Sequence, residues 1–301
     1  MKQLVILSGK GGTGKTIVTA AFAHLAAHSQ LAGKLILADA DVDAANLELI
    51  LKPHLLEQQD FKGGKVAEID QDSCTSCGNC EAVCRFDAIN HLDDLYLIDP
   101  IACDGCAACV YQCPEESISM CEQVAGKFYF SESAHEYGPL YHANLFPGKD
   151  NSGKLVTLIR QRARQQALDE NYELILVDGP PGIGCPVISA VSGASLALIV
   201  AEPSVAGVHD MHRVLQTVWH FGVRAVVCIN KADIYPAGAD EIEAFCHDND
   251  IETVGRIPFD LTVSRAMVAG EAVTAFHPEA ASSIAIAEIW ETTLALSLES
   301  E

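Results

Sequence analysis

The sequence predicts a doubly wound α/β domain with a mostly parallel sheet, into which a smaller α+β domain is inserted. Short apolar segments alternate with amphipathic helical segments along most of the chain, which is typical of strands buried on both faces of a parallel sheet. Between residues 62 and 122 this alternation stops, and glycine, aspartate and cysteine dominate. We therefore assign residues 1–61 and 123–301 to the main domain and residues 62–122 to the insert.

The main domain begins with a strand and continues as alternating strands and helices. Runs of Val, Ile, Leu and Ala predict strands at residues 3–8, 34–39, 173–178, 195–202, 224–230 and 252–258. Amphipathic spacing predicts helices at residues 14–29, 152–169, 207–220, 238–248 and 280–297. Residues 127–147 are expected to return to the sheet as strands. This order of elements is that of a doubly wound fold.

A glycine-rich loop follows the first strand directly. Gly9, four residues, and then Gly14-Lys15-Thr16 fit the phosphate-binding pattern between a strand and a helix. Backbone N–H groups of such a loop surround phosphate oxygens, and the helix presents its positive end to the same charge. Lys15 is expected to reach the β- and γ-phosphates, and the Thr16 hydroxyl to bind Mg²⁺. The expected nucleotide contacts in the loop are Gly9, Lys10, Gly11, Gly12, Thr13, Gly14, Lys15 and Thr16.

The loop contains a second lysine, Lys10, within the segment KGGTGKT. This segment resembles the deviant Walker A motif of the MinD/ParA/Mrp group of P-loop ATPases, which includes the nitrogenase iron protein. In that family the early lysine reaches across a nucleotide sandwich dimer to the partner's phosphates. The resemblance implies that Lys10 makes the ATP site depend on dimerisation. The alternative is a solvated loop lysine without a partner in catalysis.

Two further segments resemble the same family. LADADVDAANLEL (37–49) resembles its switch I, and ILVDGPPGIG (175–184) resembles its Walker B motif with switch II. The resemblance implies that Asp39 and Asp178 lie near Mg²⁺, and that Asp41 orients the attacking water. The expected catalytic residues are therefore Lys10, Lys15 and Asp41.

The identity of the base is left open by the sequence. Asn230-Lys231-Ala232-Asp233 reads as the NKxD motif with which GTPases recognise guanine. In MinD-like ATPases an asparagine at the same strand end contacts adenine, and GRIPFD (255–260) resembles that family's adenine-side loop. The lysine signature favours Mg-ATP, with GTP as the alternative. Asn230 and Pro258 are the expected residues on the base side.

The insert contains an internal repeat of cysteines. Four cysteines recur 29 residues later with the spacing C-x₂-C-x₂-C-x₃-C, which is that of bacterial two-cluster ferredoxins. In those proteins the fourth cysteine of each run ligates the other cluster. The resemblance implies one [4Fe–4S] cluster on Cys74, Cys77, Cys80 and Cys113, and a second on Cys103, Cys106, Cys109 and Cys84. Zinc is the alternative, but four ligands per zinc ion would not require this repeated run.

Cys185 lies seven residues after Asp178, within the segment that resembles switch II. In the nitrogenase iron protein a cysteine at that spacing ligates a cluster that bridges two subunits. That cluster needs a second cysteine in each subunit, for which this sequence has no convincing match. Packing at the start of a helix is therefore the favoured interpretation of Cys185.

Composition restricts the class of partner. The chain has 301 residues with 19 Lys and Arg against 41 Asp and Glu, and a net charge of −22 opposes nucleic acid or an anionic membrane as the main partner. No apolar run is long enough to span a bilayer, and the apolar N-terminal segment is too short for a signal peptide, so a cytoplasmic location is expected. Nine of the 12 cysteines lie between Cys74 and Cys121, which in that compartment favours metal ligation over disulfides.

These observations lead to three functional hypotheses. The first is a dimeric ATPase whose nucleotide state controls electron transfer through two [4Fe–4S] clusters, in metal-cluster assembly or anaerobic redox metabolism. Its expected partners are a second copy or a paralogous ATPase, and a redox or cluster-acceptor protein. The second is an Fe–S cluster carrier or scaffold. The third is a positioning ATPase like MinD or ParA, which the negative charge and the absence of Lys or Arg after Arg265 oppose.

Overall fold

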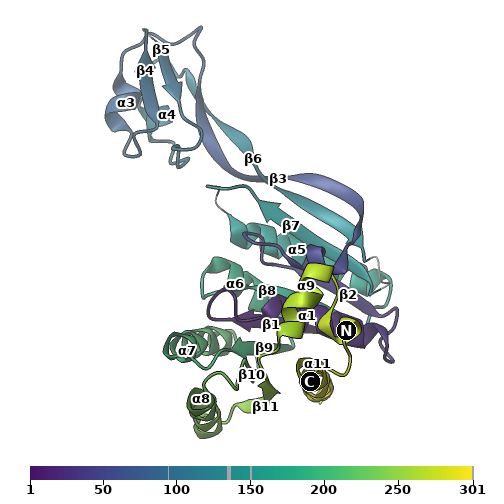
Figure 1. The fold of residues 1–301 in the computed structure, drawn as a ribbon. Coiled ribbons are helices and arrows are strands. Elements are labelled where there is room, and N and C mark those ends of the chain that lie inside the picture. The colour runs from purple at the N-terminus through teal and green to yellow at the C-terminus, as the bar shows by residue number, and fades with distance from the viewer. Residues whose placement is uncertain (94, 134–136, 150, 300–301) are drawn as a thin grey trace. The chain divides into compact units, whose positions relative to one another are not determined.

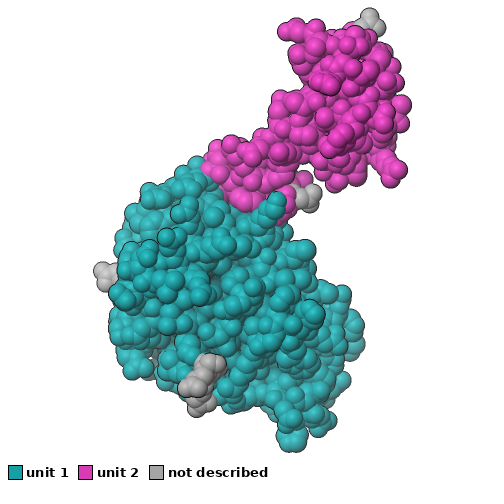
Figure 2. Space-filling view, turned by 180° about the vertical axis from the view of Figure 1, so that it is seen from behind, with its two compact units in different colours: residues 1–59, 128–144, 152–301 teal, residues 60–127, 145–151 magenta. Residues whose placement is uncertain are grey.

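The computed structural model describes residues 1–301 apart from residues 94, 134–136, 150 and 300–301. The chain separates into two compact units (Figure 2). Unit 1 comprises residues 1–59, 128–144 and 152–301, and unit 2 comprises residues 60–127 and 145–151. The predicted insert, residues 62–122, lies within unit 2.

A single sheet forms the centre of unit 1, with the strand order β11-β10-β9-β1-β8-β2-β7-β6-β3 (Figure 1). The pairs β1–β8, β1–β9, β2–β8, β2–β7, β9–β10 and β10–β11 are parallel. The predicted fold class, a doubly wound and mostly parallel sheet, is confirmed. The strands are β1 (Lys2–Ser8), β2 (Leu35–Asp39), β3 (His54–Ile69), β6 (Ile118–Glu132), β7 (Pro139–Leu145), β8 (Leu174–Pro181), β9 (Leu196–Ala201), β10 (Ala225–Asn230) and β11 (Glu252–Ile257).

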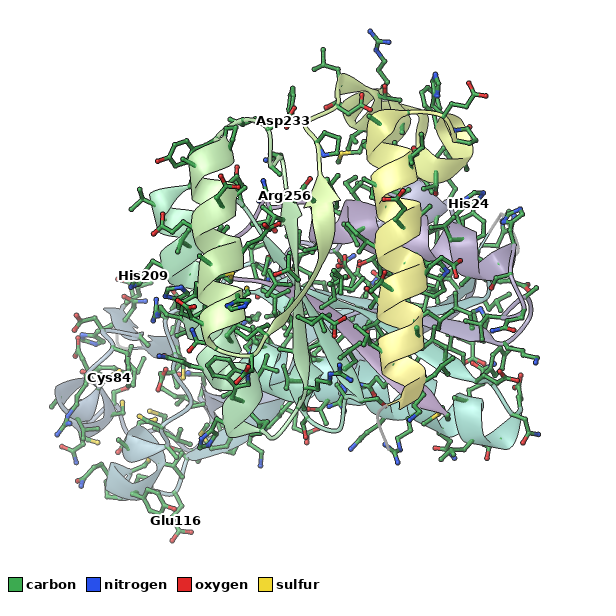
Figure 3. The ribbon with its side chains drawn as sticks, turned by 90° about the horizontal axis from the view of Figure 1, so that it is seen from below. His24, Cys84, Glu116, His209, Asp233 and Arg256 are labelled. Carbon is green, nitrogen blue, oxygen red and sulfur yellow. The ribbon has the colours of Figure 1, made fainter. Side chains whose placement is uncertain are left out.

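Helices cover both faces of this sheet (Figures 1 and 3). On one face α1, α10 and α11 pack together, and the rings of Phe22 and Trp290 lie 4.9 Å apart. On the other face α5, α6, α7 and α8 follow one another. None of the helices among the described residues is long and apolar enough to cross a membrane. The helices of unit 1 are α1 (Lys15–Ala27), α2 (Leu47–Leu51), α5 (Ser152–Asp169), α6 (Cys185–Val191), α7 (Val205–His220), α8 (Pro236–Asp248), α9 (Leu261–Ala269), α10 (Val273–Phe276) and α11 (Ala281–Glu299).

The carboxyl ends of the parallel strands form one edge of the sheet, which is where ligands bind in doubly wound folds. The loop after β1 leaves from this edge, and the parallel register of β2 and β8 places Asp39 directly beside Asp178. Because β1 also neighbours β9, the residues that follow β9 lie at the same edge. The topology therefore gathers segments that are distant in sequence around the phosphate-binding loop.

Unit 2 shows the cysteine repeat as a structural repeat. Its helices α3 (Asn79–Val83) and α4 (Ala108–Gln112) have the same length and lie 29 residues apart in the chain. Both are preceded by a residue with positive φ, which is Gly78 at 77° and Ala107 at 61°. The hairpin of β4 (Ile89–Leu92) and β5 (Leu95–Ile98) is antiparallel. The core is small, and its buried residues are Ala67, Cys80, Ile89, Tyr96 and Ile118.

Candidate functional site

The phosphate-binding loop occupies residues 9–14, between the end of β1 and the start of α1. Gly14 has a φ of 101°, and a Cβ at this position would overlap the side-chain amide of Asn230. The same amide donates a 2.6 Å hydrogen bond to the carbonyl oxygen of Thr13. Lys231 donates to the carbonyl oxygen of Gly12 at 3.3 Å. The end of β10 therefore holds the loop in place, and only glycine fits at its last position.

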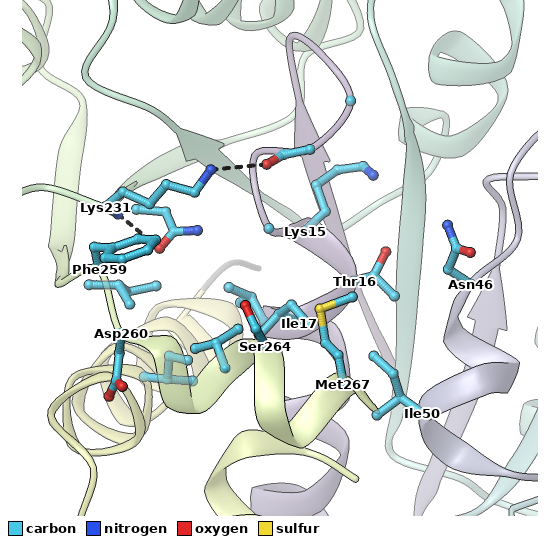
Figure 4. A pocket seen from close by; sticks show the side chains of 18 of the residues that line it. Lys15, Thr16, Ile17, Asn46, Ile50, Lys231, Phe259, Asp260, Ser264 and Met267 are labelled. Carbon is cyan, nitrogen blue, oxygen red and sulfur yellow. Dashed lines mark hydrogen bonds between the residues drawn. The ribbon is translucent and has the colours of Figure 1, made fainter. Parts of the chain in front are cut away.

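A pocket of about 490 Å³ opens beside this loop (Figure 4), within the range of about 300–1,000 Å³ typical of small-molecule sites. One part of its wall is polar and the other is apolar, with Ile17, Ile50 and Met267. Gly9, Lys10 and Thr13 lie outside the lining. The predicted nucleotide-site residues that line the pocket are Gly11, Gly12, Gly14, Lys15, Thr16, Asp41, Asn230 and Pro258.

Three aspartates converge on the loop from two strand ends. Asp39 and Asp178 are fully buried, and Asp41 is 8% exposed. Lys15 Nζ lies 3.4 Å from Asp41 Oδ2, while the hydroxyl of Thr19 donates to Asp178 Oδ1 at 3.0 Å. Asp39 accepts hydrogen bonds of 3.1 Å from the backbone N–H groups of Asp41 and Leu47. The carboxylates predicted from the switch-like segments are thus brought together beside Lys15.

The electrostatics of this group fit a divalent cation. Burial, together with the neighbouring Asp178, raises the pKa of Asp39 well above its usual value. Burial also raises the pKa of Asp178 and of Asp41, although Lys15 acts in the opposite direction on both. Within the described part of the chain, Asp178 Oδ2 is buried without a hydrogen-bond partner. Oxygen ligands around one lysine are the donor set that Mg²⁺ takes in nucleotide sites.

Lys10 is held by its own subunit in this conformation. Its ammonium group forms an ion pair of 2.8 Å with Glu202, at the carboxyl end of β9, and lies 3.4 Å from the Ser204 hydroxyl. Lys231 shares the same carboxylate at 3.3 Å. Burial acts to raise the pKa of Glu202, but hydrogen bonds and charge from the two lysines outweigh it and lower the pKa. Lys10 is therefore bound within its own chain rather than free in solvent.

Asp233, the last residue of the NKxD-like segment, takes a structural contact. Figure 3 labels it beyond the end of β10, and its carboxylate accepts a 2.6 Å hydrogen bond from the backbone N–H of Phe259. Phe259 and Pro258 line the pocket, whereas Asp233 lies outside the lining. Asp233 therefore contacts the backbone of a pocket-lining residue and does not itself face the pocket.

The eight repeated cysteines of unit 2 surround two small cavities. Each cavity is lined by three cysteines of one run and the fourth cysteine of the other run. Among the described residues, no three His, Cys, Asp or Glu side chains stand close enough to hold a single metal ion. The cavities are lined by Cys74, Cys77, Cys80 and Cys113, and by Cys84, Cys103, Cys106 and Cys109.

The surroundings of these thiols differ within each quartet. Burial raises the pKa of Cys80 and of Cys109, which sit on α3 and α4. At Cys113 burial acts in the same direction, but hydrogen bonds from Ser117 outweigh it and lower the pKa. The Cys113 sulfur lies 3.1 Å from the Ser117 hydroxyl. All eight are free thiols, which is the donor chemistry that an iron–sulfur cluster requires.

Cys185 lines neither cavity and is exposed at the first residue of α6. Gly153 lies opposite it, since a Cβ there would come 3.3 Å from the Cys185 Cβ.

Two residues of the nucleotide site were not predicted from the sequence. Thr19 lies one helical turn after Lys15, and Glu202 directly follows β9, the strand beside β1, so helix periodicity and strand order were the available signals.

Fold and site together define a P-loop nucleotide-binding protein. The sequence matches the CobQ/CobB/MinD/ParA nucleotide binding domain over residues 4–273. The chain belongs to this family, and the predicted family resemblance is confirmed. A solved MinC:MinD cell division complex from Aquifex aeolicus shares the fold with a TM-score of 0.60 and 21% identity, covering 98% of this chain and 96% of that one.

Three curated proteins extend the comparison. The uncharacterized protein MJ0578 of Methanocaldococcus jannaschii is 34% identical over 76% of this chain and 78% of its own length. Ferredoxin-1 of Chlorobaculum tepidum is 42% identical over 16% of this chain and 86% of its own length. The cytosolic Fe-S cluster assembly factor Nubp1 homolog of Drosophila grimshawi is 29% identical over 38% of this chain and 44% of its own length. The chain is thus a P-loop ATPase-family protein with relatives among iron–sulfur proteins.

Proposed function

We propose that the protein is a dimeric ATPase in which the nucleotide state controls electron transfer through two [4Fe–4S] clusters. The observation that carries this proposal is the presence, in one chain, of a phosphate-binding pocket and two cavities that are each lined by four cysteines. Each quartet combines both cysteine runs, as the two-cluster ferredoxin pattern requires. The likeness to Ferredoxin-1 covers most of that protein and supports the same assignment.

In the nucleotide site, each residue has a role set by its position. Lys15 binds the β- and γ-phosphates, and Thr16, Asp39 and Asp178 hold Mg²⁺ directly or through water. Lys15 and Asp41 form an ion pair in this conformation, so phosphate binding would draw Lys15 from Asp41. The released carboxylate would then orient the attacking water.

Dimerisation is proposed to complete the site through Lys10. The ion pair with Glu202 holds this lysine in its own subunit. To reach the phosphates of a partner, Lys10 would have to leave the Glu202 carboxylate and bind the phosphate oxygens instead. The partner would be a second copy or a paralogous ATPase. Because Lys231 contacts both Glu202 and the carbonyl oxygen of Gly12, that exchange would also alter the position of the phosphate loop at Gly12.

ATP is favoured over GTP as the nucleotide. Guanine recognition by an NKxD motif requires the aspartate to accept hydrogen bonds from the base. Here the carboxylate of Asp233 accepts from the Phe259 N–H and lies outside the pocket lining. Asp233→Asn is therefore expected to leave the preference for ATP over GTP unchanged. Competition between the two triphosphates for binding measures this preference.

In unit 2, bound clusters would supply one-electron transfer, and the thiolates of the two quartets would hold them. The test is anaerobic preparation of the full chain, iron analysis and a redox titration with Mg·ATP analogue or Mg·ADP. About eight irons per chain and a midpoint potential that differs between the two nucleotides are expected. Equal potentials and equal electron-transfer rates in both states would contradict nucleotide control.

A cluster carrier is the second candidate, favoured by the likeness to the Nubp1 homolog. In that case the clusters would leave the protein, whereas an electron-transfer protein retains them. Incubation of the iron-loaded protein with an apo-ferredoxin and Mg·ATP separates the two functions. Transfer of iron that depends on ATP turnover would favour the carrier, and retention of iron through many turnovers would favour electron transfer.

A further inference from the structure

A buried histidine connects the switch-like segment of the nucleotide site to the strand that continues into unit 2. His142, on β7, is 3% exposed, and both of its ring nitrogens face polar groups. Nδ1 lies 3.0 Å from Oε2 of Glu48, on α2, and Nε2 lies 2.9 Å from the hydroxyl of Ser131, on β6. The ring also stacks on Tyr129 at 5.0 Å. None of these four residues touches the phosphate loop, so nucleotide binding alone does not explain them.

On one side this histidine is linked to the Mg²⁺ site. Glu48 follows Leu47, whose backbone N–H donates to Asp39 Oδ2 at 3.1 Å. The neighbouring His142 ring, acting against burial, lowers the pKa of Glu48. Helix α2 has only five residues, of which Leu47, Ile50 and Leu51 are buried. One peptide therefore separates the group that contacts Asp39 from Glu48.

On the other side the histidine is linked to β6. This strand runs without interruption from Ile118 to Glu132, and Ile118 lines the cavity of the first cysteine quartet. Ser131 is 1% exposed, so its hydroxyl has no access to water as a substitute partner. A change in the position of the His142 ring must therefore move Ser131 or break their hydrogen bond. Either outcome alters β6.

We propose that Glu48 and His142 are positioning residues that transmit the state of the Mg²⁺-nucleotide site to β6, and so regulate the cysteine-bearing unit. The inference rests on the proposed function, because it supplies the means by which nucleotide controls the clusters. A cation held by Asp39 would compete with the Leu47 N–H for the carboxylate oxygens, and α2 would shift in response. Coupling between distant sites requires an element with two arrangements, and the proposal assigns that part to α2.

The experiment is hydrogen–deuterium exchange on the iron-loaded full chain under anaerobic conditions, with Mg·ATP analogue and with Mg·ADP. His142→Phe keeps a ring stacked on Tyr129 but removes both nitrogens, and Glu48→Met keeps the length of the side chain but removes both oxygens. Tyr129→Phe is the matched control, since it leaves both ring-nitrogen contacts in place. In the unmodified protein and the control, we expect the amides of α2 and of β6 residues 126–132 to differ between the nucleotides. In both test variants the β6 difference should be lost while the α2 difference remains.

The outcomes separate the inference from the proposed function. A β6 difference that persists in a variant that binds nucleotide and iron normally would overturn the inference, as would its absence from the unmodified protein. Midpoint potentials, measured on the same samples, report on the proposed function. If the midpoint potentials stay the same with both nucleotides while the exchange pattern follows the expectation, Glu48 and His142 do link the nucleotide site to β6, but the link does not control electron transfer. If His142→Phe does not fold, Glu48→Met alone decides.

Discussion

The nucleotide site of unit 1 and the cysteine cavities of unit 2 differ in what holds their residues in place. In unit 1 the residues lie at the ends of strands in a large sheet, and hydrogen bonds such as that from Asn230 to Thr13 fix them without a ligand. In unit 2 the buried core consists of five residues, one of which is the proposed ligand Cys80. A core this small rarely supports a fold by itself. We therefore expect the first site to be formed before its ligand binds, and the second to depend on its proposed clusters.

Removal of the clusters tests this difference most directly. After anaerobic chelation of iron, we expect residues 66–121 to lose their protection from hydrogen exchange and to become sensitive to proteolysis, because cluster binding contributes the folding free energy of unit 2. Unit 1 should keep its thermal transition and its affinity for Mg·ATP. Two results would contradict this difference between the units. One is that unit 2 keeps its hydrogen-exchange protection after iron is removed, and the other is that unit 1 unfolds together with unit 2.

Within unit 1 the largest effect of a single substitution is expected at Lys10. Lys10→Gln should lower ATP turnover by about 10³-fold or more, the size of effect associated with a cation supplied in trans to a transferring phosphoryl group. ATP binding by the monomer and iron content should be unchanged. Turnover and gel filtration with Mg·ATP are the measurements.

The control for Lys10 is Glu202→Gln, which removes the carboxylate that holds the lysine but leaves the lysine in place. We expect this variant to dimerise at the same protein concentration as the unmodified chain or at a lower one. Normal turnover in Lys10→Gln would show that the ion pair with Glu202 is all that Lys10 provides.

The sequence predicted the central strands well, because a strand buried on both faces must be apolar along its whole length. The phosphate loop was predictable for a similar reason, since Gly14 has no space for a Cβ and must be glycine. The short helices α2, α9 and α10 were not predicted, because helices of this length depend on tertiary contacts more than on periodicity. The length of β3 and β6 was also missed, since their exposed polar residues give little alternation.

Contacts between distant segments were the least predictable part of the site. The pairs Lys10–Glu202 and His142–Glu48 join elements that become neighbours only through the strand order and the packing of α2. The cysteine quartets were predicted from the resemblance of the repeated run to two-cluster ferredoxins, in which the fourth cysteine of each run ligates the other cluster. The structure therefore identifies functional contacts that the sequence does not predict mainly where the two residues are distant in sequence.

Double substitutions would sharpen the assignment of the two quartets. Cys84→Ser should halve the iron content, to about four per chain, because three thiolates retain a cube poorly. Adding Cys103→Ser should cause little further loss, since both residues line the same cavity. Adding Cys74→Ser should remove the remaining iron, because that residue lines the other cavity. If Cys84→Ser and Cys74→Ser together spare one cluster, each run holds its own cluster and the crossed pattern is wrong.

The smallest expected effect concerns the stability of the nucleotide-free site. Burial raises the pKa of Asp178, so its ionised form destabilises the folded state, and Oδ2 lacks a hydrogen-bond partner among the described residues. Asp178→Asn keeps an acceptor for the Thr19 hydroxyl and removes the charge beside Asp39. We expect it to stabilise the nucleotide-free protein at pH 7 by about 1 kcal/mol, or roughly 2–4 °C in Tm, while weakening Mg·ATP binding.

The pH dependence of this gain has a definite sign. Below about pH 4, the pKa of an unfolded aspartate, both states hold the proton, so the variant and the unmodified protein should be equally stable. As pH rises toward the raised folded-state pKa, only the unfolded state releases its Asp178 proton. The unmodified protein therefore loses stability, and the variant becomes the more stable of the two. Mg·ATP should reverse the difference, because the cation compensates the Asp178 charge only in the unmodified protein. Thermal scans of both proteins from pH 4 to 8, with and without Mg·ATP, measure this. A variant that is less stable at pH 7 without nucleotide would mean that the carboxylates are already compensated, and that the site does not need a cation.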